Sequence, residues 1–178
     1  MMRWKRGAAI AVVLLLLLFA ARTVLYLVSE YSGIIEVSVD PGQPFYAVYF
    51  SCPGSLFLVP EFNQGSGTIE ERLESLLTGP RHPELSPVIP EGVRLLGYNQ
   101  RGDVLYLNFS HHLITNHQGG STGEIFTVYG IVNTLVGAQG VRRVQILVEN
   151  RRISTLAGHL DLREPLEKDY EILGGSQI

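Results

Sequence analysis

The stretch VNTLVGAQGVRRVQILVENRRI, residues 132–153, decides the fold. It holds the end of an apolar helical pattern, a turn between Gly137 and Gly140, and an apolar strand. Val144 and Val148 share one face of that strand, because side chains alternate between the two faces of a sheet. No residue in the stretch is typical of catalysis. The pattern therefore indicates a domain whose clearest segments serve packing.

Two helices are predicted before this turn. Thr68 and Glu71 form a capping box, in which each side chain satisfies a free amide at the helix start, and a Gly-Pro pair ends the pattern. We therefore expect a helix over 68–78. Ser121 and Glu124 repeat the capping-box spacing, and the apolar pattern after them predicts a second helix that ends at the glycine turn.

Short apolar runs between Gly, Pro and Asn residues predict strands. We expect strands at 45–50, 55–60, 93–98, 103–110 and 141–149, and a last short strand within 151–158. The third and fourth are predicted to form an antiparallel hairpin across the NQRG turn. Hairpins that alternate with single helices predict an α+β fold, with a mixed or antiparallel sheet and two helices on one face.

The N-terminal residues differ from the rest of the chain. A basic start precedes an apolar run of 22 residues from 7 to 28, counted through Arg22, which is long enough for a transmembrane helix. The alternative is a cleaved signal peptide, but Leu18 or Phe19 would stand where cleavage needs a small residue. We expect an anchor with a cytoplasmic N-terminus, because the short flank is basic. The predicted organisation is an anchor or signal peptide at 1–28, a linker at 29–44, one domain at 45–166 and a tail at 167–178.

The part of the chain after the anchor is acidic. All 17 acidic residues lie at or after Glu30, together with 10 of the 14 basic residues, so this part has a formal charge of −7. An acidic domain repels phosphate backbones. Nucleic acid is therefore excluded as an expected partner.

Histidines near the second helix are the first candidates for a metal site. His111, His112 and His117 follow Asp103, and imidazole is a common zinc ligand. Adjacent histidines in an extended segment point to opposite faces, and no H-E-x-x-H or C-x-x-C motif is present. We interpret the segment as a solvated loop and expect no metal or cofactor.

Nucleophilic catalysis has little support in the sequence. Ser110 stands beside His111, but a catalytic triad needs a base placed in space by the fold, and no G-x-S-x-G motif is present. Cys52 is the only cysteine and cannot form an intramolecular disulfide. We interpret it as a half-buried residue near a strand end. No catalytic, cofactor-binding or metal site is assigned.

The chain resembles the GerMN domain family of sporulation and spore-germination proteins from about residue 45 to residue 166. The resemblance rests on VYF with LVP, ERLESLLTGP, SPVIPEGVRLLG, GDVLYLNFS and the long segment that contains 132–153. Asn108 stands where such domains often have aspartate, and Asn150 replaces a common glycine in a hairpin turn. The resemblance implies a compact α+β domain, similar to ring-building motifs, without known catalytic residues.

The expected function is a membrane-anchored, non-enzymatic domain on the extracytoplasmic side. It would act in protein–protein assembly with an envelope protein partner or by self-association, through a sheet edge or a helix face. One alternative is a cell-envelope hydrolase acting on peptidoglycan or glycan, which predicts that one or two of Glu61, Asp103, His111 and His112 converge in a cleft. The other is a ligand- or metal-binding module that uses the loop 111–123.

Overall fold

The structure is a computed structural model that describes Arg22 and residues 42–173. The predicted anchor at 1–28 therefore lies outside the described residues, apart from Arg22, as do most of the linker at 29–44 and the end of the tail at 167–178. Within the described residues, no helix combines the length and the apolar character that crossing a membrane requires.

The described strands form two separate sheets. An antiparallel hairpin is made of β1 (Phe45–Phe50) and β2 (Val59–Gln64). The large sheet is made of β3 (Leu95–Arg101), β4 (Val104–Phe109), β5 (Arg143–Val148), β6 (Arg151–Arg152) and β7 (Leu166–Glu167). Its order is β3-β4-β5-β6, and β7 also pairs with β5. It is a mixed sheet, because β4 and β5 are parallel while its other pairs are antiparallel.

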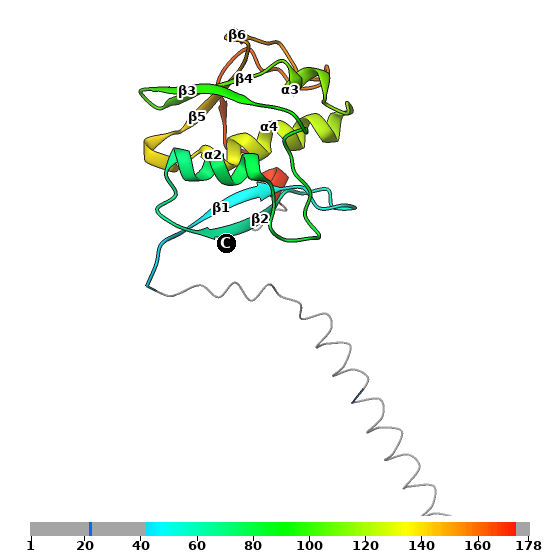
Figure 1. Ribbon diagram of the computed structural model, residues 1–178. Coiled ribbons are helices and arrows are strands. Elements are labelled where there is room, and N and C mark those ends of the chain that lie inside the picture. Colours follow the sequence, from blue (N-terminus) through cyan, green and yellow to red (C-terminus); the bar gives the residue numbers. More distant parts are fainter. Residues whose placement is uncertain (1–21, 23–41, 174–178) are drawn as a thin grey trace, which may run out of the picture. The chain divides into compact units, whose positions relative to one another are not determined.

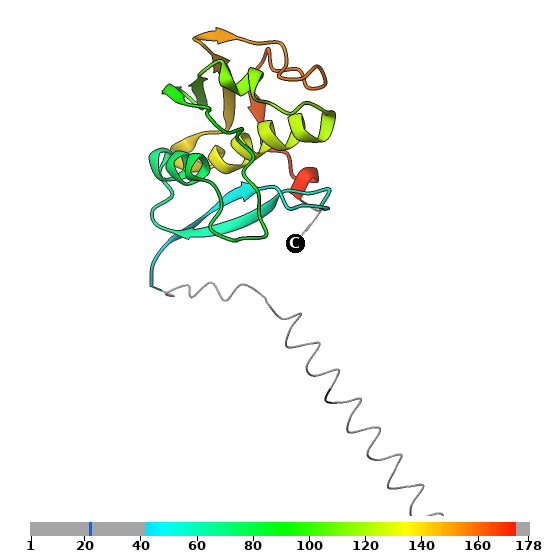
Figure 2. The ribbon, with the colours of Figure 1, turned by 45° about the vertical axis from the view of Figure 1, so that its right-hand side comes forward.

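Two of the three described helices lie between the two sheets. The three helices are α2 (Ile69–Thr78), α3 (His112–Thr115) and α4 (Ser121–Leu135), with 3-10 turns η1 (Ala138–Gly140) and η2 (Glu171–Leu173). Figures 1 and 2 show α2 and α4 between the hairpin below and the large sheet above. The predicted order of elements is confirmed from β1 to β6, and α2 and α4 lie on one face of the large sheet. The segment after β4 was predicted as a loop but contains the short helix α3, and β7 is an additional strand. The first hairpin does not join that sheet; it covers the opposite side of the helices.

The core lies where the helices meet the two sheets. Ile131 and Leu135 of α4 are fully buried, as are Val48 of the hairpin and Leu105 and Leu107 of the large sheet. Burying one such side chain stabilises the fold by about 1.5–3 kcal/mol. Because α4 is covered on two sides, its buried residues extend around the helix rather than along one stripe.

The first helix agrees with its prediction. Helix α2 begins after Thr68, and both bonds of the capping box are present. The Glu71 amide donates to the Thr68 hydroxyl at 3.2 Å, and the Thr68 amide donates to the Glu71 carboxylate at 3.1 Å.

The second strand lies further along the chain than predicted. The sequence predicted a strand at 55–60, whereas β2 runs from Val59 to Gln64. Two polar residues of β2, Glu61 and Asn63, point inward and are buried. Glu61 is satisfied there because its carboxylate accepts the amide N–H groups of Arg81 and His82, both at 2.9 Å. This polar inner face hides the strand from a search for apolar alternation.

The prediction of a second capping box, formed by Ser121 and Glu124, is wrong. Helix α4 begins after Gly120, which has a φ of 80°, and no side chain caps this end. The Glu124 side chain turns to the loop 155–159 and accepts the amide N–H groups of Leu156 at 2.8 Å and Ala157 at 3.0 Å. Glu124 accepts several hydrogen bonds from the backbone of this loop, whereas a capping box would offer it a single amide, so the loop contacts are more stable.

The hairpin of β3 and β4 has a tighter turn than predicted. The sequence predicted residues 99–102 as the turn, but Asn99 and Gln100 continue the ladder opposite Tyr106 and Leu105. The chain reverses at Gly102, whose φ of 60° suits a glycine.

Candidate functional site: an open groove beside helix α2

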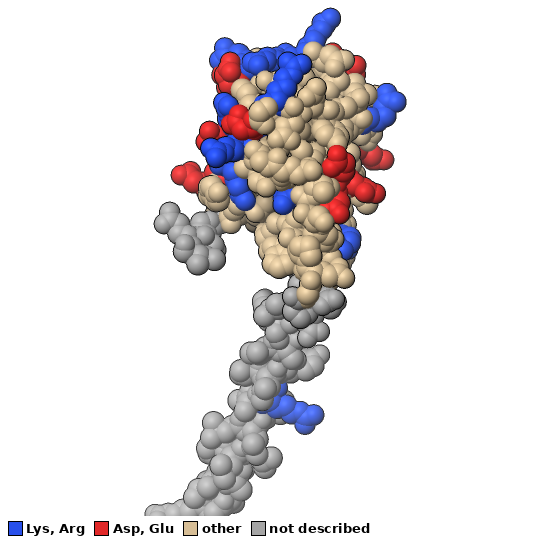
Figure 3. All heavy atoms as spheres, turned by 90° about the vertical axis from the view of Figure 1, so that its left-hand side faces the viewer, with Lys and Arg blue, Asp and Glu red and all other residues tan. Residues whose placement is uncertain are grey.

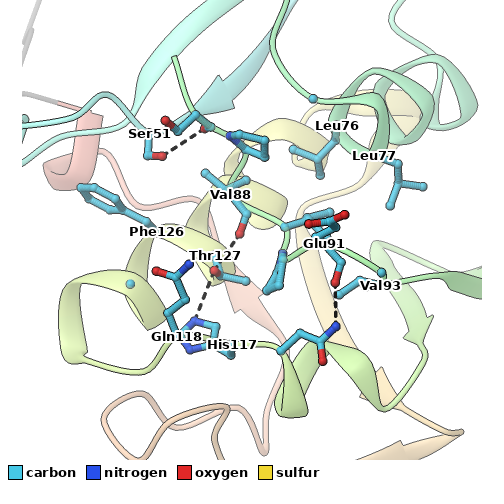
Figure 4. Close-up of a pocket in the computed structure, with 18 of the residues that line it drawn as sticks. Ser51, Leu76, Leu77, Val88, Glu91, Val93, His117, Gln118, Phe126 and Thr127 are labelled. Atoms are coloured by element: carbon cyan, nitrogen blue, oxygen red, sulfur yellow. Dashed lines mark hydrogen bonds between the residues drawn. The ribbon is translucent and has the colours of Figure 1, made fainter. Parts of the chain in front are cut away.

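An open groove of about 1050 Å³ lies among the described residues. Three segments form it: the C-terminal end of α2, the segment 86–93, and residues 116–119 before α4 (Figure 4). Leu77 and Phe126 contribute apolar side chains to its lining. We refer to this hollow as the groove.

The segment 86–93 is fixed at its start by the end of β1. The Ser86 amide donates to the Ser51 carbonyl at 2.8 Å, and the Ser51 amide donates back to the Ser86 carbonyl at 3.2 Å. Further along, Val88 packs directly on α4 at Gly130. A Cβ atom at position 130 would lie 2.7 Å from Val88 Cγ2, so a glycine is needed for this approach.

A chain of hydrogen bonds joins the segment 86–93 to the opposite wall. The Thr127 hydroxyl donates to the Val88 carbonyl at 2.7 Å and lies 3.4 Å from His117 Nε2. The Gly119 amide donates to His117 Nδ1 at 3.0 Å. Because Nδ1 accepts, the proton of the neutral ring lies on Nε2 and points to Thr127. The fold therefore holds the imidazole as a wall residue with both nitrogens engaged.

The lining of the groove suits binding better than acid–base chemistry. Glu91 and His117 are its only titratable side chains. The Glu91 carbonyl accepts the Asn116 side-chain amide at 2.7 Å, which ties the two walls together a second time. No group of His, Cys, Asp and Glu among the described residues could hold a metal ion.

The residues considered for a hydrolase do not converge. Asp103 lies in the β3–β4 turn, where the Arg143 guanidinium donates to its carboxylate at 3.0 Å and lowers its pKa. His111 and His112 lie beyond the other end of β4, so the length of the strand, about 20 Å, separates them from Asp103. Glu61 belongs to the hairpin, on the opposite side of the helices.

The two candidate nucleophiles, Ser110 and Cys52, make contacts that belong to the fold. Ser110 is 1% exposed, and its hydroxyl accepts the Arg94 amide at 3.0 Å. The neighbouring His111 amide donates to the Glu149 carboxylate at 2.9 Å. Cys52 is half-buried in the loop after β1, as predicted, and its Sγ lies 3.9 Å from the Pro53 carbonyl.

The groove contains residues that sequence reasoning did not single out. Of the predicted ligand loop 111–123, residues 116–119 and Gly123 lie in its lining. The segment 86–93 and Leu77 were missed as functional candidates. The available signal was proline spacing: prolines at 80, 83, 87 and 90 hold a long connection extended against the domain.

Beside the groove, Glu124 is a fully buried carboxylate with an unusual pKa. Burial alone raises the pKa, but the amide of Ala157, the hydroxyl of Thr155 and the amides of His159 and Leu156 all donate to the carboxylate. Together they lower its pKa to about 2. The ionised side chain thus fastens the loop 155–159 to the first turn of α4.

Several solved structures are similar to this chain. A protein from Clostridium perfringens described as a lipoprotein is 25% identical, with a TM-score of 0.52, over 72% of this chain and 90% of that one. The tandem GerMN domains of the sporulation protein GerM from Bacillus subtilis are 20% identical, with a TM-score of 0.55, over 74% of this chain and 48% of that one. The first GerMN domain of the same protein is 12% identical, with a TM-score of 0.52, over 71% and 96%.

The last two likenesses concern the fold alone, and this chain spans about half of the tandem structure. No curated protein matches the sequence. Residues 47–154, more than half of the chain, match the Germane family model, which is described as sporulation and spore germination. These residues include the groove walls, the helices and most of both sheets. The GerMN resemblance predicted from the sequence is confirmed, and the chain belongs to the Germane family.

Proposed function

We propose that this chain is a membrane-anchored, non-enzymatic domain of the cell envelope that binds a partner protein through the groove. The family description supports a role in sporulation or spore germination. The apolar residues 7–28 support a membrane anchor and an extracytoplasmic domain. The description of the Clostridium perfringens protein as a lipoprotein is in line with an envelope location.

The observation that carries the proposal is the groove itself. Its volume of about 1050 Å³ lies at the upper limit of the roughly 300–1,000 Å³ that small-molecule sites occupy. Small-molecule sites also enclose most of their ligand, whereas this groove is open. A length of polypeptide fits such a hollow better than a compact metabolite.

The lining indicates which kind of polypeptide fits. Glu91 is the only carboxylate in it, and it contains no lysine or arginine. Leu77 and Phe126 offer apolar contacts, and the end of α2 offers backbone carbonyl groups that no further helical turn can use. The expected occupant is therefore an extended, mostly uncharged segment of an envelope protein that can donate backbone hydrogen bonds.

Site-specific photo-crosslinking in cells tests the proposal. A photoreactive amino acid replaces Leu77 or Gln118, which both line the groove, in the full chain. The matched control carries it at Arg151, an exposed residue of β6. We expect one discrete heterologous adduct from both groove positions and none from the control.

The other outcomes are equally informative. An adduct of twice the mass of this chain would identify a second copy as the occupant and replace partner binding by self-association. The absence of adducts at both groove positions, with the chain present in the membrane fraction, would contradict the proposal.

A further inference from the structure

The outer face of the hairpin is mostly apolar and exposed to solvent. Side chains of β1 and β2 alternate between a buried inner face and an outer face. The outer face is formed by Phe45, Ala47, Tyr49, Pro60 and Phe62, together with the polar Gln64 opposite Phe45. Phe45 is 58% exposed and Phe62 39%. Their rings meet edge to face, with centroids 5.7 Å apart. We refer to the five apolar residues as the hairpin face.

The loop between β1 and β2 extends this apolar surface. Leu56 is 74% exposed and Phe57 45%. The loop is bonded to the C-terminal segment, because the Leu58 amide donates to the Ile172 carbonyl at 2.8 Å, and the nearby Tyr170 is 71% exposed. Of the eight large apolar side chains exposed among the described residues, five belong to the hairpin, its loop or this adjoining segment.

This region also carries little charge of its own. Residues 42–67 contain one charged residue, Glu61, which is buried and lies 3.3 Å from the Arg81 guanidinium. The Arg81 guanidinium is exposed and donates to the Phe62 carbonyl at 2.8 Å, so it is the cation next to β2. Figure 3 shows charged side chains crowded on the upper part of the domain and sparse on the lower part, where the hairpin lies. At the rim, Lys168 Nζ lies 5.2 Å from the ring centre of Tyr49 and 5.3 Å from that of Tyr170.

We propose that the hairpin face and the Leu56–Phe57 loop lie against the lipid surface of the membrane that holds the N-terminal segment; this rests on the proposed anchoring. The linker 29–44 joins the apolar segment directly to Phe45, at the first residue of the hairpin. Its 16 residues span at most about 55 Å. The hairpin is thus the element that the anchor tethers most closely, and it carries the exposed apolar surface.

The chemistry of the face fits a bilayer interface. Exposed phenylalanine and leucine side chains enter the boundary between headgroups and acyl chains, and binding grows with apolar area. Lys168, between two tyrosines, has the position and charge to contact anionic headgroups. Protein interfaces usually mix apolar residues with a polar rim and about one hydrogen bond per 100–200 Å². The hairpin face has five outward residues without a charged side chain, which favours lipid over a protein partner.

Tryptophan quenching by brominated lipids tests this proposal with the full chain in liposomes. Trp4 is the only native tryptophan, so all variants carry Trp4→Phe. One variant adds Phe57→Trp and a second adds Leu56→Trp, both at exposed loop positions. The matched control adds Leu96→Trp, which is 44% exposed on β3, beyond the helices from the hairpin. We expect brominated lipid to reduce the emission of both loop variants and to leave the control unchanged.

Flotation of the same liposomes separates this proposal from the anchoring on which it rests. Chains that float while both loop variants resist quenching would overturn the membrane contact and leave the anchoring intact. Chains that do not float would overturn the anchoring as well. The emission of the loop tryptophans could instead shift to the blue as the protein concentration rises, equally in brominated and in unbrominated lipid. This result would show that a second copy covers the hairpin face, and it would also overturn the proposal.

Discussion

Asn108 and Asn150 hold each other through two hydrogen bonds. The backbone N–H of Asn150 donates to Asn108 Oδ1 at 2.7 Å, and Asn108 Nδ2 donates to Asn150 Oδ1 at 2.9 Å. Asn150 has a φ of 61°, a conformation that asparagine tolerates better than most residues. Asn108 and Asn150, which the resemblance to GerMN domains singled out as departures from the usual residues, are thus in contact with each other.

We expect the two departures to compensate for one another. Asn108→Asp keeps the acceptor for the Asn150 amide but turns a carboxylate oxygen towards Asn150 Oδ1. Asn150→Gly leaves the buried Asn108 amide without its acceptor. Each single substitution should cost about 1–2 kcal/mol, whereas the double variant should cost clearly less than their sum. Urea unfolding of the four proteins measures this coupling, and additive losses would disprove it.

Stability should fall on acidification because of Glu124. Its pKa is lowered from 4.5 to about 2 in the folded protein, so its contribution is complete above pH 4.5 and is lost as the pH falls towards 2. The lowered pKa corresponds to about 3 kcal/mol, since one pKa unit is worth about 1.4 kcal/mol. Denaturant unfolding as a function of pH checks this loss.

The Glu124→Gln variant should lose a comparable stability at neutral pH and should respond less to acid. A side-chain amide offers only one acceptor oxygen to a site made of donors. Glu164→Gln is the matched control, because the Glu164 side chain is 84% exposed. Equal acid responses of wild type and Glu124→Gln would show that other carboxyl groups cause the loss.

Gly130→Ala should destabilise the domain, although alanine is the better helix former. The new Cβ atom would lie 2.7 Å from Val88 Cγ2, and such overpacking costs about 1–3 kcal/mol. Gly123→Ala, in the same helix, is the control, because its Cβ atom would meet only His117 Cε1 at 3.6 Å. Thermal unfolding should show a loss for the first variant only, and Val88→Ala should restore part of it.

We expect the hydrogen bond from the Thr127 hydroxyl to keep the segment 86–93, which forms one wall of the groove, in its position on α4. Thr127→Val keeps the shape of the side chain but leaves the buried Val88 carbonyl without its donor, at a cost of about 1–3 kcal/mol. Thr127→Ser keeps the hydroxyl and should be close to wild type. A photo-crosslinker at Gln118 should give less adduct in Thr127→Val than in Thr127→Ser. Equal adducts would show that the wall is set by packing alone.

Sequence patterns predicted those elements whose side chains form hydrogen bonds with residues close to them in the sequence. The capping box of α2 uses Thr68 and Glu71, three residues apart, and both bonds form as expected. Ser121 and Glu124 have the same spacing, but Glu124 finds its partners more than thirty residues further on. A spacing rule contains no information about such distant donors.

The groove required the tertiary structure for the same reason. Its walls come from α2, the segment 86–93 and the loop before α4, and no pattern in one segment reveals the other two. The strand β2 was misplaced because Glu61 points inward and is satisfied by amides some twenty residues away. Polar residues with distant partners are the ones that sequence patterns misassign.

The position of α4 between the hairpin and the large sheet has a consequence for local opening of the domain. It contacts β1 on one side and β5 and β7 on the other, so separating either sheet from the helices still leaves one side of α4 covered. Amide hydrogens of its central turns should therefore exchange with solvent only through global unfolding, while those of the hairpin exchange through smaller and more frequent openings. Such a gradient would let the hairpin adapt to a neighbouring surface while the rest of the domain keeps its native hydrogen bonds.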